Sequence, residues 1–135
     1  PQRVRGDVRT GGGTTMRSRV ERRVLVIEDE GVILLDLELV LEELGYTVAG
    51  SACDLAGGSR LAETLDVDIA VLDVDLSGQS SGPIADILTA RRIPFLFVSG
   101  YPAASLPDGH TARPCLAKPY CPKLLHAAME RELRR

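Results

Sequence analysis

Short apolar runs recur along the chain, and polar residues directly follow most of them. The runs lie at residues 24–27, 46–50, 69–72, 94–98 and 115–117. A continuous apolar run of this length predicts a strand that is buried on both faces, which is typical of a parallel sheet. Helix-like or turn-rich segments separate the runs. The sequence therefore predicts an α/β domain in which helices cover both faces of a five-stranded parallel sheet.

The helices between these strands are expected to be of unequal length. The first expected helix runs from residue 32 to 44, ends before Gly45, and turns these apolar residues to the core: Ile33, Leu37, Val40, Leu41 and Leu44. Further helices are expected at residues 55–65 with Asp54 as cap, at 84–90, and from Pro122 to the end. Prolines and glycines between residues 101 and 114 leave room for only a short or irregular fourth helix.

The charge is distributed unevenly. The chain of 135 residues has a net charge of −3, and residues 1–23 contribute +5, so the remainder carries −8. We expect residues 1–20, with no hydrophobic periodicity, to be a disordered basic arm or a non-native remnant, and residues 21–135 to be one folded domain. The acidic domain argues against nucleic-acid binding. No apolar run is long enough to cross a bilayer, and the three cysteines lack metal-binding spacing, so we expect a cytoplasmic protein.

Polar side chains follow the first, third, fourth and fifth predicted strands. They are Asp29, Asp73, Ser99 and Lys118. The carboxyl ends of parallel strands meet at one edge of a sheet, which is where such folds place their chemistry. With Glu28, three carboxylates converge there, and each pair of charges about 4 Å apart repels by roughly 1–4 kcal/mol. A hard divalent cation such as Mg²⁺ removes that penalty.

A cation, a carboxylate, a hydroxyl and a lysine form a set suited to phosphoryl transfer. Mg²⁺, Lys118 and Ser99 can each hold one oxygen of the phosphoryl group, while Asp73 attacks as nucleophile and becomes an acyl phosphate.

Four motifs, at residues 24–30, 71–75, 98–100 and 118–120, resemble those of the receiver domains of two-component response regulators. The resemblance implies a flavodoxin-like sheet with strand order 2-1-3-4-5. It also implies Asp73 as phospho-acceptor, Glu28 and Asp29 as the acid pair at a Mg²⁺ ion, and a metal contact from the backbone carbonyl of Asp75. Ser99 would be the switch hydroxyl and Lys118 the phosphate-binding lysine, with a cis bond to Pro119. The implied donor is a phosphohistidine on a histidine kinase or phosphotransfer protein.

Residues 95–101 resemble a receiver subgroup common in alphaproteobacteria, which has a Phe-Ala-Thr-Gly-x-Tyr-like motif here. Two positions depart from the usual receiver pattern. Cys115 replaces the aromatic residue that normally couples to the switch hydroxyl, and Tyr101 is either its substitute or a surface residue. Asp75 is an acid where a neutral residue is usual.

An apolar stripe on the first expected helix points away from its core face. It consists of Val32, Leu35 and Leu39. Such a stripe predicts a partner contact. We favour docking of the phosphate donor, with a homodimer contact as the alternative.

Three functions are compatible with the sequence. The first is a phospho-acceptor receiver, either a complete single-domain regulator or a fragment of a longer one, with no chemistry beyond its own phosphorylation and dephosphorylation. The second is a pseudo-receiver that binds partners without phosphorylation. The third is a phosphohydrolase that uses the Asp73-x-Asp75 pair.

Overall fold

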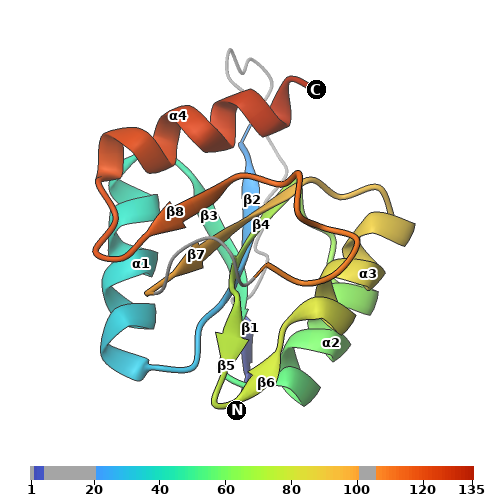
Figure 1. Ribbon diagram of the computed structural model, residues 1–135. Helices are drawn as coiled ribbons and strands as arrows, with labels where there is room; N and C mark the ends of the chain where they lie inside the picture. Colours follow the sequence, from blue (N-terminus) through green and yellow to red (C-terminus); the bar gives the residue numbers. More distant parts are fainter. Residues whose placement is uncertain (1, 5–20, 101–105) are drawn as a thin grey trace, which may run out of the picture.

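The computed structural model describes residues 2–4, 21–100 and 106–135, which form a sheet with helices on both sides (Figure 1). The main sheet has the strand order β1-β3-β2-β4-β7-β8. Its strands are β1 (Gln2–Val4), β2 (Arg23–Ile27), β3 (Thr47–Ala52), β4 (Ile69–Asp73), β7 (Phe95–Ser99) and β8 (Cys115–Ala117). Five of these strands, β3, β2, β4, β7 and β8 in sheet order, pair in parallel, and β1 lies outside them at the edge. This is the predicted flavodoxin-like sheet with the predicted strand order.

Two helices cover each face of the sheet. The helices α1 (Gly31–Glu43) and α4 (Pro122–Leu133) pack on one face, and α2 (Leu55–Thr64) and α3 (Gly82–Ala90) pack on the other (Figure 1). Side chains from alternate strand positions enter the two cores. In β4, for example, Ile69 and Val71 face α1 and α4, whereas Ala70 and Leu72 face α2 and α3. Because both faces are buried, each central strand appears in the sequence as a continuous apolar run.

The first helix is rotated slightly from the predicted orientation. Leu37 and Leu41 are fully buried, as expected, and Val40 and Leu44 pack against the same core. However, Leu34 rather than Ile33 joins this core. Leu34 lies three and seven positions before Leu37 and Leu41, so the buried stripe follows the helical period back from those two residues.

A capping side chain explains where the second helix begins. Asp54 accepts a hydrogen bond from the backbone N–H of Gly57 at 2.7 Å and so caps α2, as predicted.

After β4 the chain forms a small hairpin, β5 (Asp75–Leu76) and β6 (Gln79–Ser80), where the sequence predicted only a loop. Between β7 and β8, residues 106–114 form turns and contain no helix.

The predicted basic arm falls mostly outside the described residues. Within it, β1 pairs antiparallel with β3 at the edge of the sheet. The boundary at residue 21 therefore stays a prediction. In the part of the chain that the structure describes, no helix is both long and apolar enough to cross a membrane.

Candidate functional site

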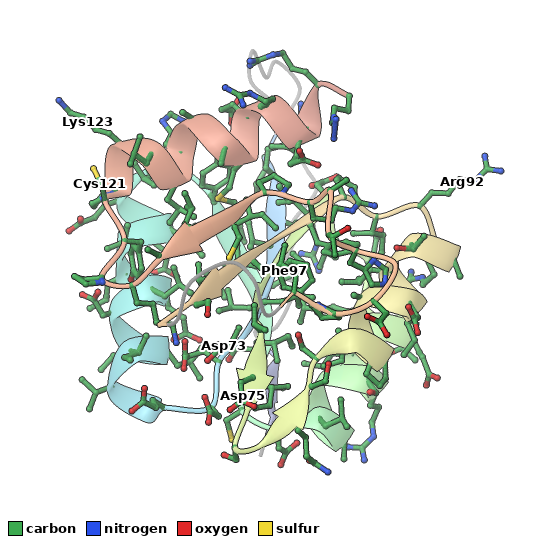
Figure 2. All side chains as sticks on the ribbon, viewed as in Figure 1. Asp73, Asp75, Arg92, Phe97, Cys121 and Lys123 are labelled. Carbon is green, nitrogen blue, oxygen red and sulfur yellow. The ribbon has the colours of Figure 1, made fainter. Side chains whose placement is uncertain are left out.

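The carboxyl ends of the parallel strands bring the predicted polar residues together at one edge of the sheet. Glu28 and Asp29 directly follow β2, Asp73 ends β4, and Ser99 ends β7. Lys118 follows β8. A pocket of about 830 Å³ opens here, and it is lined by Asp29, Asp73, Ser99 and Lys118 together with residues of the β5–β6 hairpin. Figure 2 shows Asp73 at the end of β4, with Asp75 beyond it at the start of the hairpin.

The Lys118 ammonium lies between two buried carboxylates. Its Nζ donates a hydrogen bond to Asp73 Oδ2 at 2.9 Å and lies 2.8 Å from Glu28 Oε1. The Lys118–Pro119 peptide bond is cis. Burial alone would lower the pKa of Lys118, but its contacts with the Glu28 and Asp73 carboxylates outweigh burial and hold the pKa above the usual range. The lysine is therefore a fixed positive charge directly beside Asp73.

Glu28, Asp29 and Asp73 form a cluster that could hold a metal ion. Each offers one carboxylate oxygen, and these atoms lie within 4.8 Å of one another. The contact with Lys118 does not have hydrogen-bond geometry, so the buried Glu28 Oε1 accepts no hydrogen bond from the described residues. The single charge of Lys118 faces a cluster of three carboxylates, so the cluster keeps a net negative charge that a further cation would neutralise. The donor set is all oxygen, which fits a hard cation such as Mg²⁺.

The electrostatics of the acids support the same interpretation. Burial raises the pKa of Glu28 to about 7, although Lys118 and the backbone N–H of Glu30 oppose this shift. Burial also raises the pKa of Asp73, again against the influence of Lys118. Burial would raise the pKa of Asp29 too, but hydrogen bonds, those from Ser77 first among them, bring it below its usual value. The cluster therefore carries more negative charge than Lys118 and the other surrounding groups stabilise without a further cation.

Ser77 is a contact of this cluster that sequence reasoning missed. Its backbone N–H and its hydroxyl both donate to Asp29 Oδ2, at 2.9 and 3.0 Å. The adjacent Ser-Gly pair is a turn signal. Nothing in the local sequence indicates that this turn reaches a side chain 48 positions earlier.

The remaining predicted site residues differ in how the structure places them. Ser99 is buried at the end of β7. Asp75 is exposed, and its Oδ2 accepts a hydrogen bond from the Gly78 N–H at 3.1 Å. Tyr101 lies outside the described residues. Cys115 is half-buried and packs against the core under α2 and α3.

The predicted apolar stripe is exposed on α1. The exposed fractions are 83% for Val32, 54% for Leu35 and 53% for Leu39. A link across the edge of the sheet ties α1 to the lysine loop, because the Tyr120 hydroxyl donates to Asp36 Oδ2 at 2.9 Å. The stripe therefore lies on a helix that is physically connected to the segment carrying Lys118.

Comparison with known proteins identifies the class to which this fold and site belong. The chain is 30% identical over 126 residues to the phyllosphere-induced regulator PhyR of Methylorubrum extorquens, a match covering 90% of this chain and 47% of PhyR. It is 36% identical over 84 residues to the transcriptional regulatory protein PdtaR of Mycobacterium tuberculosis, covering 62% of this chain and 41% of PdtaR. No protein-family model matches the chain.

One solved structure is matched over nearly its whole length. The solution structure of the beryllofluoride-activated conformation of SdrG from Pseudomonas melonis has a TM-score of 0.68 and 35% identity, covering 82% of this chain and 95% of that one. The chain is a receiver domain of the response-regulator family. It spans about half the length of the curated relatives it matches.

Proposed function

We propose that this receiver accepts a phosphoryl group from a phosphohistidine onto Asp73. The observation that carries the proposal is the Lys118 ammonium held 2.9 Å from Asp73 and 2.8 Å from Glu28, beside a three-carboxylate cluster. A phosphoryl group entering this pocket meets a nucleophile, a fixed cation and a metal-binding set in one place. Two relatives of the chain are named as regulators, which is consistent with a signalling role.

The chemistry follows from these positions. An oxygen of Asp73 attacks the phosphorus, the new P–O bond forms as the P–N bond to the imidazole breaks, and the donor histidine leaves. Lys118 then moves its hydrogen bond from the carboxylate to a phosphoryl oxygen. A Mg²⁺ ion bound by Glu28, Asp29, Asp73 and the backbone carbonyl of Asp75 would neutralise the charge on the phosphoryl oxygens.

Signalling requires a surface that reports the state of Asp73. We propose that the buried Ser99 hydroxyl turns toward the phosphoryl group and that its movement alters the segment after β7, which includes Tyr101. Cys115 is too small to act as the usual rotating aromatic residue. The stripe of Val32, Leu35 and Leu39 would dock the histidine kinase or phosphotransfer protein, which places the reaction in the cytoplasm.

The hydrolase alternative needs a second acid that can protonate a leaving group. Asp75 has the correct spacing after Asp73, but its carboxylate accepts a hydrogen bond from Gly78 within the hairpin. This arrangement gives Asp75 a role in the turn and favours the receiver.

Incubation with acetyl phosphate and Mg²⁺, followed by intact-mass measurement, tests the proposal. We expect a stoichiometric phosphoryl adduct that hydroxylamine removes and that Asp73→Asn abolishes. Rapid turnover of phosphoesters without a lasting adduct would assign a hydrolase. Absence of both an adduct and Mg²⁺ binding would assign a phosphorylation-independent pseudo-receiver.

A further inference from the structure

The hairpin after β4 turns back toward the acid cluster, and Ser77 in its turn contacts Asp29. Ser77 and Gly78 form its two-residue turn between β5 and β6. Both hydrogen bonds from Ser77, one from the backbone and one from the hydroxyl, end on the same oxygen, Asp29 Oδ2. Donors that converge on one oxygen of a carboxylate restrict the orientation of the whole group.

The backbone of the turn shows that Ser77 is held in an uncommon conformation. Its φ is +53° and that of Gly78 is +88°, the pair of left-handed values that a type I′ hairpin turn requires. Glycine and asparagine adopt these values readily, whereas serine pays a steric penalty. Two hydrogen bonds to an ionised carboxylate offset that penalty, since charge-assisted bonds are roughly twice as strong as neutral ones.

The turn is also braced from its other side. The Gly78 N–H donates to Asp75 Oδ2 at 3.1 Å, and the backbone N–H of Asp75 donates to Asp73 Oδ1 at 3.3 Å. The hairpin thus contacts two of the three clustered acids, Asp29 through Ser77 and Asp73 through Asp75. Its position depends on the same carboxylates that would bind the metal.

We propose that Ser77 is a positioning residue of the metal site, acting through Asp29. By holding Oδ2, it presents Oδ1 of Asp29 toward the space shared with Glu28 and Asp73. Groups that orient a metal ligand from outside the coordination sphere change metal affinity by about 10- to 100-fold when removed. The inference rests on the proposed function, because it assumes that the cluster binds Mg²⁺.

The substitution Ser77→Gly distinguishes the contribution of the hydroxyl from that of the backbone turn. Glycine keeps the backbone N–H that donates to Asp29 and accepts the left-handed φ without strain, so the hairpin should remain. Only the Oγ hydrogen bond is lost. Gln79→Ala is the matched control, since Gln79 is exposed in the same hairpin and its side chain makes no hydrogen bond with the described residues.

The measurement is Mg²⁺ affinity by calorimetric titration, together with thermal unfolding without metal. We expect Ser77→Gly to weaken Mg²⁺ binding about tenfold, with an unfolding midpoint within about 5 °C of the wild type. Gln79→Ala should bind like the wild type. At saturating Mg²⁺, the rate of phosphorylation by acetyl phosphate should recover in Ser77→Gly, because a positioning residue changes binding rather than the chemical step.

Two results would overturn the inference. One is an Mg²⁺ affinity for Ser77→Gly within twofold of the wild type. The other is a loss of affinity accompanied by a larger fall in the unfolding midpoint, which would make Ser77 a residue of the turn alone. If the wild-type chain itself binds no Mg²⁺, the proposed function fails first, and that outcome is visible in the same titration.

Discussion

Glu28 has the most perturbed environment of the site acids, because it is fully buried and, among the residues that the structure describes, Lys118 is its one cationic contact. Its pKa of about 7 in the folded chain lies above the ordinary value of 4.5. Between these two values the folded state holds a proton that the unfolded state releases. The contribution of Glu28 to the stability of the metal-free protein should therefore fall as the pH rises from about 4.5 to 7.

Glu28→Gln removes this titration. At pH 8 without metal we expect it to be more stable than the wild type by about 1–3 kcal/mol, with little difference at pH 4.5. Urea unfolding in a chelating buffer at both pH values measures this difference in the free energy of unfolding. Glu43→Gln, an exposed position on α1, should leave the pH dependence unchanged. Equal pH dependence in wild type and Glu28→Gln would contradict the account.

At the residue scale, position relative to the strands made most of the site predictable. Glu28, Asp29, Asp73, Ser99 and Lys118 meet because each is at or just beyond the carboxyl end of a parallel strand. Ser77 was not predictable, because its contact with Asp29 depends on how a two-residue turn folds back across the sheet edge. Tertiary contacts of this kind leave no periodic signal in the sequence.

At the element scale, the segment between β7 and β8 is anchored although it forms no helix in its described part, residues 106–114. His110 packs edge-on against Phe95, and its Nε2 lies 2.7 Å from Asp86 Oδ1 on α3. The Arg113 guanidinium lies 4.2 Å above the same Phe95 ring and 3.5 Å from the buried Glu132. Side-chain contacts therefore hold the described part of this segment against the rest of the domain.

Arg113→Ala should destabilise the fold by about 1–3 kcal/mol, because it removes the cation over Phe95 and leaves the buried Glu132 with Arg135 as its remaining ion-pair partner among the described residues. The midpoint of urea unfolding measures the loss. Arg92→Ala is the control: Arg92 extends into solvent (Figure 2), and its removal should change stability by less than about 0.5 kcal/mol. Equal effects of the two substitutions would refute the anchoring role.

The exposed stripe on α1 makes a prediction about the donor. Leu35→Glu combined with Leu39→Glu should slow phosphotransfer from a histidine kinase about tenfold or more, because central apolar contacts dominate such interfaces. Phosphorylation by acetyl phosphate should be unaffected. Thr89→Glu combined with Ala90→Glu, exposed on α3, is the matched control. Equal loss with both donors would argue against docking on α1.

The sequence predicted elements well where hydrophobic pattern determines them. Each central strand was identifiable because burial on both faces demands a continuous apolar run, and α2 because Asp54 caps it. The hairpin β5–β6 was not identifiable from the sequence, because two-residue strands are too short to show a periodic pattern. The sequence did not determine whether Ile33 or Leu34 packs against the core. Several neighbouring residues of α1 are apolar, so the pattern permits either rotation of the helix.

At the scale of the whole molecule, the proposed phosphorylation of Asp73 would signal by changing a distant surface. The segment 106–114 is a candidate, since Leu106 packs on the core, Pro107 is buried close to Gly82, and β8, which follows it, leads to Lys118. The contacts of this segment are made by a few individual side chains, so they can rearrange while the sheet stays intact.

We expect beryllofluoride with Mg²⁺ to slow hydrogen exchange of the amides between residues 106 and 114, because capture of Lys118 and Ser99 by the phosphoryl mimic would tighten β7 and β8. Amides of α2 should serve as an internal reference with unchanged exchange. Identical exchange of residues 106–114 with and without the mimic would exclude this segment as the reporting surface.

Chemical trapping tests most directly whether Asp73 carries the phosphoryl group. Borohydride reduces an aspartyl phosphate to homoserine, which peptide mass spectrometry locates in the sequence. After phosphorylation with acetyl phosphate and Mg²⁺, the account predicts homoserine at position 73 and at none of the other aspartates. Homoserine at Asp29 or Asp75, or at no position in a chain that has gained a phosphoryl group, would contradict it.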